Sequence, residues 1–268
     1  MRLFPFRRLV VSQLLVCPLT PEQHTAAAAL AAELGLPFAE MPAADSTHVL
    51  MQEPDRLALH TLGKHAPGPV YVDFVQGAAA WRRQHGGGRG QLLPKAVGVK
   101  GETLPSVIDS TAGLGRDGFV LATLGCPVTL LERSPLAFAL LRDGIRRALV
   151  DDEVAPIAAR MELFRTDARD YLQQLADDQR PDVVLVDPMF PDRGKAALAK
   201  KEMQAFQALI GDDLDAPALL QAALAVAKKR VAVKRPRLGE VIAGPKPSLQ
   251  LSGQSTRFDI YFRHERRE

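Results

Sequence analysis

The residues with the clearest chemical potential lie in the segment Asp187-Pro188-Met189-Phe190, which directly follows the apolar run Val-Val-Leu-Val. The apolar run predicts a buried strand, so the acid emerges at the strand end and proline stiffens the turn. An exocyclic amine on a nucleobase is a poor nucleophile, because its lone pair is delocalised into the ring. The Asp187 carboxylate and the Pro188 carbonyl can accept its two N–H bonds, and Phe190 can stack on the base, which contributes roughly 1–3 kcal/mol.

In isolation, the same four residues are more typical of a turn cap followed by a core aromatic residue. Their position after the fourth strand of a sheet that also carries a glycine-rich loop favours the catalytic interpretation. Asp187, Pro188 and Phe190 are therefore the candidate catalytic residues, and this chemistry needs no metal. The remaining requirement is to orient the amine in line with the group that it attacks.

A glycine-rich loop predicts a nucleoside-type cofactor. Gly113 and Gly115 follow a predicted strand, and glycine lets a backbone turn tightly and approach a ligand. With Gly118 they satisfy the pattern G-x-G-x-x-G, at the carboxyl end of a strand, where α/β sheets bind ligands. Glu132 ends the next predicted strand, at the place where an acid contacts ribose hydroxyls.

Two acids flank this loop and favour a cationic cofactor. A nicotinamide dinucleotide would place its pyrophosphate over the helix N-terminus, where Asp109 and Asp117 would oppose the anion. The same acids would suit the sulfonium and amino groups of S-adenosylmethionine (SAM), although either acid can instead cap a helix. A nicotinamide-dependent oxidoreductase remains an alternative, but none of the six histidines lies at the end of a strand of the predicted parallel sheet.

The elements that must position these residues alternate regularly between strand and helix. Such alternation predicts a parallel sheet with right-handed crossovers, and two runs flanking Ser-Gly-Gln-Ser predict an antiparallel hairpin at the end. The fold class is therefore α/β, a Rossmann-like class I methyltransferase sheet with parallel strands plus a C-terminal antiparallel hairpin. The predicted strands are 107–110, 128–132, 161–165, 182–187, 230–234, 248–251 and 257–263, and the helices are 117–124, 135–149, 168–176, 196–210 and 216–227.

The first part of the chain predicts a small N-terminal α/β domain over residues 1–75, followed by the catalytic domain over residues 76–268. The opening apolar run is interrupted by Ser12 and Gln13, which favours a strand over a secretory signal. A helix is expected from Pro21 to about Gly35, with Thr20 as its N-cap. Short strands are expected at 48–51, 57–60 and 70–75.

Composition and charge are those of an ordinary globular protein, with 47% hydrophobic and 24% charged residues. Cys17 and Cys126 are far apart in apolar contexts, so reduced and buried thiols in a cytoplasmic protein are expected. The net charge is only +3, yet residues 82–100 carry five Lys or Arg, residues 228–237 carry six, and neither segment contains an acid. Such segments are compatible with a nucleic-acid partner or with a solvated surface.

Several blocks of the sequence closely resemble the bacterial ribosomal RNA small subunit methyltransferase J family. They are VDFVQGAAAWRRQHGGGRG, DSTAGLGRDGFVLATLGCPV, LLERSP, VDPMFPDR, KKEM, VAVKRPR and RFDIY, which run from about residue 72 to the C-terminal region. The resemblance implies methyl transfer from SAM to the N2 amine of one guanine near the 3′ end of 16S rRNA, with S-adenosylhomocysteine as product. A methyltransferase acting on another nucleic-acid amine is an alternative, and so is a non-catalytic RNA-binding assembly factor.

The resemblance also implies site residues. By the family pattern the cofactor contacts are Arg116, Asp117, Glu132, Arg133 and Asp187. The family has a pair of serines after the third strand, where this chain has Asp167 and Ala168, so that contact departs from the pattern. Related amine methyltransferases carry a second proline where this chain has Met189. The expected partner is 16S rRNA or the small ribosomal subunit, and the candidate phosphate contacts are Arg82, Arg83, Arg89, Lys234 and Arg235.

Overall fold

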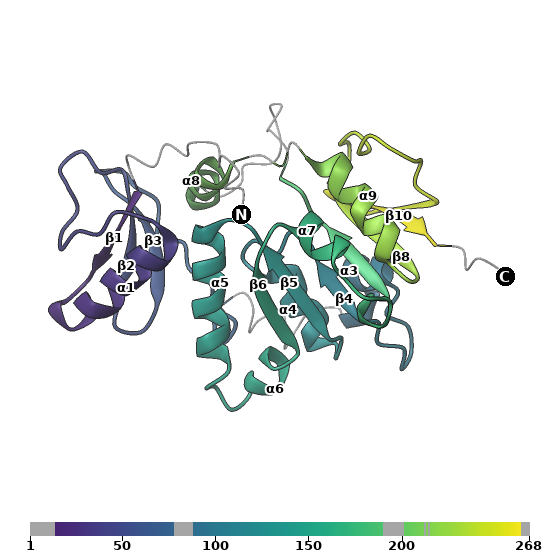
Figure 1. Cartoon of the computed structure of the whole chain (residues 1–268), viewed down its shortest axis with the longest axis horizontal. Helices are drawn as coiled ribbons and strands as arrows, with labels where there is room; N and C mark the ends of the chain where they lie inside the picture. Colours follow the sequence, from purple (N-terminus) through teal and green to yellow (C-terminus); the bar gives the residue numbers. More distant parts are fainter. Residues whose placement is uncertain (1–13, 78–87, 190–200, 212, 214, 264–268) are drawn as a thin grey trace. The chain divides into compact units, whose positions relative to one another are not determined.

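The computed structural model describes residues 14–77, 88–189, 201–211, 213 and 215–263 of the 268-residue chain. The chain divides into two compact units (Figure 1). The first unit comprises Met1–Val72, Ala139–Gly144 and Pro191–Asp212, and the second comprises Asp73–Phe138, Ile145–Phe190 and Asp213–Glu268. The predicted site residues Arg82, Arg83 and Phe190 lie outside the described residues, and for Arg89 only the backbone is described.

The first unit contains a three-stranded sheet in the order β1-β2-β3, with α1 packed on β1 (Figure 1). Strands β1 and β2 are parallel, and β2 and β3 are antiparallel. Helix α1 ends at Gly35, whose φ of 67° is in the left-handed region that favours glycine. The bounds are β1 Leu14–Pro18, η2 Pro21–Gln23, α1 His24–Leu34, β2 His48–Gln52 and β3 Leu57–Thr61.

The expectation of a strand over residues 70–75 is wrong. Val70 forms a single antiparallel bridge to Leu59, and the backbone then leaves the sheet. The apolar side chains in this run are buried without ladder pairing, at Val70, Val72 and Phe74. Their hydrophobicity therefore reflects packing, which a strand-like sequence pattern cannot distinguish from sheet pairing.

The second unit contains a seven-stranded sheet in the order β6-β5-β4-β7-β8-β10-β9. Strands β4 to β8 are mutually parallel, and β10 runs antiparallel to both β8 and β9. This confirms the predicted parallel sheet with a terminal hairpin. The bounds are β4 Val107–Asp109, β5 Val128–Glu132, β6 Met161–Arg165, β7 Val183–Val186, β8 Arg230–Pro236, β9 Leu249–Ser252 and β10 Thr256–Phe262.

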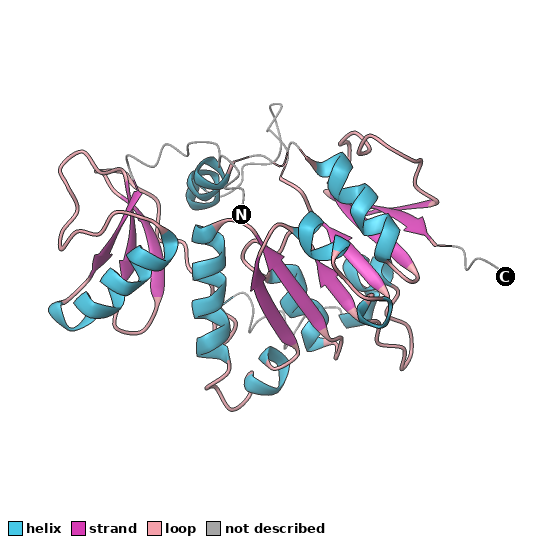
Figure 2. Ribbon diagram, viewed as in Figure 1, coloured by secondary structure: helices cyan, strands magenta, loops and turns pink. Residues whose placement is uncertain are grey.

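Helices flank this sheet, as the cyan and magenta elements of Figure 2 show. The predicted helices are found with small shifts at their ends, which is usual for helix boundaries, and residues 196–200 of the helix predicted over 196–210 lie outside the described residues. None of the helices in the described parts of the chain is long and apolar enough to cross a membrane. The bounds are η3 Gly88–Gly90, α3 Leu92–Val97, α4 Arg116–Thr123, α5 Pro135–Ala148, α6 Ala155–Ala158, α7 Ala168–Gln173, η4 Asp177–Gln179 and α9 Ala216–Val226. Helix α8, Lys201–Ile210, belongs to the first unit.

The central strands β4, β5 and β7 are buried on both faces, which explains their near-continuous apolar sequences. All four residues of β7 are buried, and Val184 and Val186 pack with α7 and α9 in one hydrophobic cluster. Leu130 of β5 faces α4, since a Cβ on Gly118 would lie 2.5 Å from its Cδ2. The third glycine of the loop motif therefore permits close packing of a helix on a strand.

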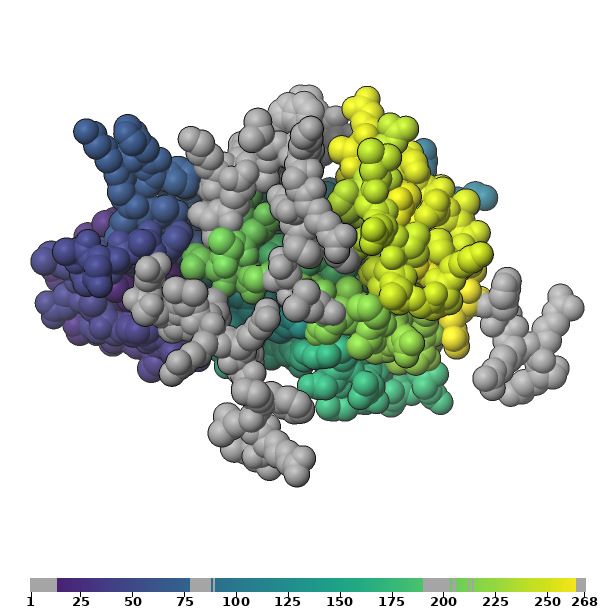
Figure 3. Space-filling model, turned by 90° about the horizontal axis from the view of Figure 1, so that it is seen from above, coloured from purple at the N-terminus to yellow at the C-terminus, as the bar shows by residue number. Residues whose placement is uncertain are grey.

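The C-terminal hairpin completes the second unit on the side of β8. Figure 3 shows the yellow residues of β9 and β10 and the lime segment that precedes them as neighbours on one face. Within the hairpin, Arg257 forms a bidentate ion pair with Asp259 at 2.7 and 2.9 Å and donates to the carbonyls of Arg237 and Gly239. These contacts fix the turn that follows β8.

The chain order reverses at β4, because β5 and β6 lie on one side of it and β7 and β8 on the other. Open α/β sheets bind ligands at the carboxyl ends of the strands beside such a reversal. The glycine loop follows β4 and the Asp187 turn follows β7, so the fold brings the two predicted motifs to the same edge of the sheet.

Candidate active site

The glycine loop joins β4 to α4 in a conformation that requires glycine at two positions. Gly113 has φ of 54° and Gly115 has φ of 70°, both in the left-handed region. A Cβ on Gly113 would meet the Thr111 carbonyl oxygen at 3.9 Å, an ordinary contact. At Gly113, backbone conformation and not crowding within the protein therefore selects glycine, and a ligand could approach the backbone there.

Glu132, at the end of β5, holds the glycine loop. Its Oε2 accepts the Gly113 N–H at 2.8 Å, and its Oε1 accepts the Ser134 N–H at 2.6 Å. Burial raises the pKa of Glu132 to about 7, although the two backbone N–H groups favour the ionised form. The carboxylate is therefore placed beside the loop, where a ribose would bind.

Asp109, the last residue of β4, is a buried acid with a strongly shifted pKa. Its side chain is 2% exposed, and its Oδ1 accepts the Thr111 N–H at 3.2 Å. Burial is the main cause that raises its pKa to about 8, and the nearby charges of Asp117 and Asp187 add to the shift. A cation bound beside Asp109 would favour its ionised form.

Lys234 of β8 joins two acids of the site. Its Nζ donates to Asp117 Oδ2 at 2.7 Å and to Asp187 Oδ2 at 2.8 Å. Burial acts to lower the pKa of Lys234, but the two carboxylates outweigh it, so the ammonium stays charged. Burial raises the pKa of Asp187, and Lys234 opposes that rise. The ammonium therefore holds the start of α4 beside the turn that follows β7.

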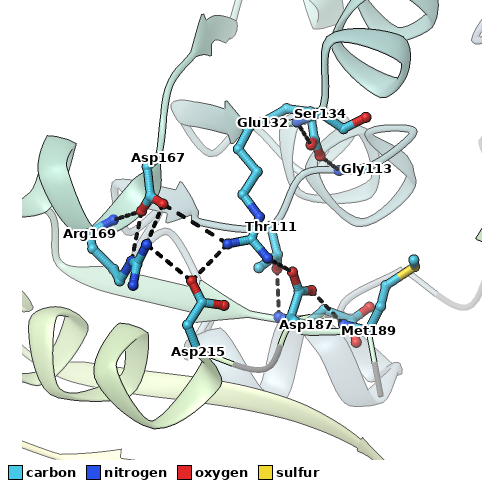
Figure 4. Close-up of polar contacts among 11 residues, drawn as sticks. Thr111, Gly113, Glu132, Ser134, Asp167, Arg169, Asp187, Met189 and Asp215 are labelled. Atoms are coloured by element: carbon cyan, nitrogen blue, oxygen red, sulfur yellow. Dashed lines mark hydrogen bonds and ion pairs between the residues drawn. The ribbon is translucent and has the colours of Figure 1, made fainter. Parts of the chain in front are cut away.

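The turn after β7 is fixed by hydrogen bonds at two residues. The Asp187 N–H donates to Thr111 Oγ1 at 2.7 Å, and the Met189 N–H donates to Asp213 Oδ2 at 2.7 Å. Figure 4 shows Thr111, Asp187 and Met189 side by side in this arrangement. The backbone of the predicted reacting segment is thus held by groups from the glycine loop and from the segment before α9.

An ion-pair network lies at the same edge, beyond β5 and β6. Arg133 contacts Asp213 and also Asp215 at 2.7 Å. Arg169 contacts Asp215 at 3.2 Å and Asp167 at 2.7 Å (Figure 4). The hydrogen bond from Arg169 is the main cause that lowers the pKa of Asp167, which also accepts the Arg169 backbone N–H at the start of α7.

The structure places the predicted cofactor residues together at this edge. Asp109, Gly113, Asp117, Glu132 and Asp187 are linked by the contacts above, and Arg133 and Asp167 lie 4.0 Å apart. The remaining predicted cofactor residues are Gly115 just before α4, Arg116 at its start, where it is exposed, and Ala168, buried at the start of α7.

The predicted phosphate contacts within the described residues have different surroundings. The Lys234 ammonium is paired with two carboxylates, and Arg235 is only 5% exposed. Arg89 lies in η3, within the glycine-rich basic segment. Their contacts with RNA stay predictions.

The donor set at this edge fits a nucleoside cofactor with a cationic centre. Buried carboxylates at the ends of β4 and β5 flank a loop with left-handed glycines, and Asp117 is in the first turn of α4. An acid in that position would oppose a pyrophosphate over the helix N-terminus. Among the described residues, no group of three or more His, Cys, Asp or Glu side chains is arranged to hold a metal ion.

Sequence reasoning missed the residues that support the site, namely Thr111, Ser134, Arg169, Asp213 and Asp215. Ser134 precedes Pro135, a common signal for a helix start, and its side chain does cap α5. Asp215 likewise precedes α9, with proline in the first turn. The sequence carries no local signal that the side chain of Asp213 meets a backbone group 24 residues away.

Comparisons with known proteins agree with this geometry. The model of the SAM-dependent methyltransferase family matches residues 29–263. A protein of Pseudomonas aeruginosa named ribosomal RNA small subunit methyltransferase J is 57% identical over 232 residues, which cover 86% of this chain and 87% of the relative. A protein of the same name from Chromobacterium violaceum is 56% identical over 243 residues, covering 90% and 93%. The chain belongs to the ribosomal RNA small subunit methyltransferase J family.

Membership makes the chain an enzyme, a SAM-dependent methyltransferase, and the alternative of a nicotinamide-dependent oxidoreductase is wrong. The crystal structure of a SAM-dependent methyltransferase from Neisseria gonorrhoeae is 40% identical, with a TM-score of 0.72, and the match covers 92% of this chain and 95% of that one. The predicted Rossmann-like class I fold is thereby confirmed.

Proposed function

We propose that this enzyme transfers the methyl group of SAM to the N2 amine of one guanine near the 3′ end of 16S rRNA, in the cytoplasm. The observation that carries the proposal is the position of Asp187. It lies at the end of β7, beside the glycine loop, with its backbone fixed by Thr111 and its carboxylate beside Lys234. The family relatives named for the small-subunit ribosomal RNA supply the substrate class.

The residues proposed to hold the cofactor are those at the carboxyl ends of β4, β5 and β6. When bound there, SAM supplies an electrophilic methyl group on a sulfonium centre. Glu132, at the end of β5, would accept hydrogen bonds from ribose hydroxyls, while Asp109 and Asp117, on either side of the glycine loop, would offset positive charge. Asp167 would accept from the adenine amine. The complete proposed set is Asp109, Gly113, Gly115, Arg116, Asp117, Glu132, Arg133, Asp167, Ala168 and Asp187.

Asp187 and Pro188 would hold the target amine. Lys234 contacts Oδ2 of Asp187, and among the contacts of the described residues none is made to Oδ1. Oδ1 and the Pro188 carbonyl are therefore the acceptors proposed for the two amine hydrogens, and Oδ1 is placed to take the proton that the amine loses on methylation. Stacking on Phe190 and unstacking of the base from its neighbours complete the proposal.

The basic segments would bind the RNA backbone. An ammonium that is paired with two carboxylates offers little net charge to a phosphate, which weakens the case for Lys234, and Arg235 is largely buried. Arg82, Arg83 and Arg89 are the other proposed phosphate contacts. Neutralising phosphates releases counterions, so the affinity should fall steeply as salt concentration rises.

The decisive test is methyl transfer from labelled SAM to small-subunit rRNA that lacks the endogenous modification, as free RNA and as particles, followed by mapping of the modified nucleotide. Asp187→Ala should lower kcat by at least about three orders of magnitude, whereas the affinity for S-adenosylhomocysteine should fall less. Asp182→Ala is a matched control, because Asp182 precedes the same strand at its other end and pairs with Lys229. Near-normal turnover in Asp187→Ala would refute the mechanism.

A further inference from the structure

Asp213, which lies just before α9, is joined to Met189 from both directions. The Met189 N–H donates to Asp213 Oδ2 at 2.7 Å, and the Asp213 N–H donates to the Met189 carbonyl at 2.9 Å. The Asp213 side chain is only 18% exposed. A hydrogen bond from an amide to a carboxylate is charge-assisted and stronger than a neutral one. Met189, the third residue of the reacting turn, is therefore attached by two hydrogen bonds to the segment before α9. We call the one that the Asp213 carboxylate accepts the clip.

The same carboxylate reaches the cofactor side of the site. Oδ1 of Asp213 accepts from Arg133. Arg133 directly follows Glu132, whose carboxylate binds the Gly113 N–H of the glycine loop at 2.8 Å. A continuous series of contacts thus runs from the glycine loop through Arg133 and Asp213 to Met189.

We propose that Asp213 is a positioning residue, which holds the Asp187–Met189 turn at a fixed place relative to the cofactor-binding residues of the enzyme. The inference rests on the proposed function, because it assigns a role in the alignment of the target amine. The proposed role of Asp213 involves no contact with either substrate. It acts through the backbone of Met189 on one side and through Arg133 on the other.

The effect of losing this clip follows from the geometry of methyl transfer. The attacking nitrogen, the methyl carbon and the sulfur must be in line, and misplacing one partner by about 1 Å can lower a rate about 100-fold. Asp213→Ala removes only the bond to the carboxylate: the backbone N–H of residue 213 can still donate to the Met189 carbonyl, and Thr111 still holds Asp187, so the turn keeps two of its three attachments and its fold. We therefore expect a kinetic defect with little change in stability.

Asp215 provides a matched control within the same network. It contacts Arg133 at 2.7 Å and Arg169 at 3.2 Å, and Figure 4 shows its side chain directed toward Arg169. Its side chain is similarly shielded, at 25% exposure. No hydrogen bond within the described residues joins Asp215 to Met189. Removing Asp215 takes one negative charge from Arg133, as removing Asp213 does, but leaves the turn attached.

The kinetic test measures kcat for methyl transfer and the affinity for S-adenosylhomocysteine in Asp213→Ala and Asp215→Ala. We expect Asp213→Ala to lower kcat by about 10- to 100-fold and to change the cofactor affinity by less than about threefold. Asp215→Ala should change kcat by less than about threefold. Equal losses of kcat in the two variants would show that the charge on Arg133 matters and not the clip, and would overturn the proposal.

Asp213→Asn is a conservative variant that separates the clip from the charge. Its carbonyl oxygen can still accept the Met189 N–H, whereas its NH₂ group cannot accept from Arg133. It should therefore recover most of the activity that Asp213→Ala loses. If the alanine variant does not fold, Asp213→Asn is measured alone. Because it keeps the hydrogen bond to Met189 and loses the ion pair with Arg133, its kcat should stay close to that of the wild type. A loss of kcat as large as about 100-fold would overturn the proposed role of Asp213.

Amide hydrogen exchange of Met189 tests the inference without any turnover. The Met189 amide should exchange faster in Asp213→Ala than in the wild type, and at the wild-type rate in Asp215→Ala. If the wild type transfers no methyl group to rRNA, the proposed function fails, and this measurement still decides whether Asp213 holds the turn. Unchanged exchange in Asp213→Ala would overturn the inference while leaving the proposed function standing.

Discussion

Replacing Lys234 with methionine should destabilise the protein, because it removes the cation between two carboxylates of the site. The ammonium lies 2.7 Å from Asp117 Oδ2 and 2.8 Å from Asp187 Oδ2, so one cation separates two carboxylates. Methionine has a similar length and no charge. The variant therefore keeps much of the packing and leaves two acids close together without the group that joins them.

The size of the effect follows from how far the three side chains are shielded. Breaking a fully buried ion pair by removing one partner costs about 3–5 kcal/mol. Here the side chains are 28% exposed for Lys234, 24% for Asp117 and 39% for Asp187, so water screens part of the interaction. We expect Lys234→Met to lower the free energy of unfolding by about 1–3 kcal/mol at pH 7, a discounted range for partly exposed pairs.

The stability difference between wild type and Lys234→Met should also change with pH in a defined direction. Burial already raises the pKa of Asp187, and loss of the neighbouring ammonium raises it further. As the pH falls, the carboxylates take up protons and their repulsion disappears. The stability difference between wild type and Lys234→Met should therefore be largest above neutral pH and should shrink toward pH 5.

Urea unfolding at pH 5.5, 7 and 8.5 measures this difference. Lys229→Met is the matched control, since Lys229 lies just before the same strand and pairs with Asp182 at 3.0 Å, but its side chain is 55% exposed. An exposed pair of this kind contributes about 0–1 kcal/mol. The reasoning is refuted if the two variants lose equal stability at pH 7, or if the loss in Lys234→Met grows as the pH falls.

Two further substitutions test the packing of Gly144 against Val72 and the ionisation of Asp109. Gly144→Ala should destabilise the protein by about 1–3 kcal/mol through overpacking. The added Cβ would lie 2.6 Å from Val72 Cβ and 3.2 Å from the Val72 carbonyl oxygen. A variant that is more stable than wild type in urea unfolding would contradict this. Asp109 has a pKa of about 8, so folding disfavours its ionised form and its contribution to stability falls as pH rises from about 4 to 8. Asp109→Asn should therefore gain stability relative to wild type across that window, and a difference that does not change with pH would contradict it.

Much of the fold could be predicted from the sequence, because the signals are local. The apolar run before Asp187 could only be a buried strand in that context, and it is β7. Gly113 and Gly115 indicated a tightly turning loop after a strand, and in the structure both have φ in the left-handed region. Over residues 70–75 the local signal was ambiguous, because an apolar run can be buried with or without pairing in a sheet. There the apolar side chains are buried, but the segment forms only a single bridge to the sheet.

The support of the site could not be predicted in the same way. Lys234 belongs to a run of basic residues, so its sequence context suggested a partner outside the protein. Strand β8 lies beside β7 in parallel register, with Val233 opposite Val186, and this places Lys234 next to Asp187. The partner of that ammonium is therefore decided by strand order, which no residue close to it in the sequence reveals.

The sequence by itself determined which residue types were available for chemistry and on which elements they lie, since hydrophobic periodicity, glycine loops and strand-end acids are properties of short segments. The tertiary structure decided which of those groups meet. Glu132 reaches Gly113 because the parallel strands β5 and β4 bring their carboxyl ends to one edge of the sheet. Asp213 reaches Met189 because the segment before α9 lies against the turn that follows β7. The physical reason is that hydrogen bonds and ion pairs act over a few ångströms in space, whatever the separation along the chain.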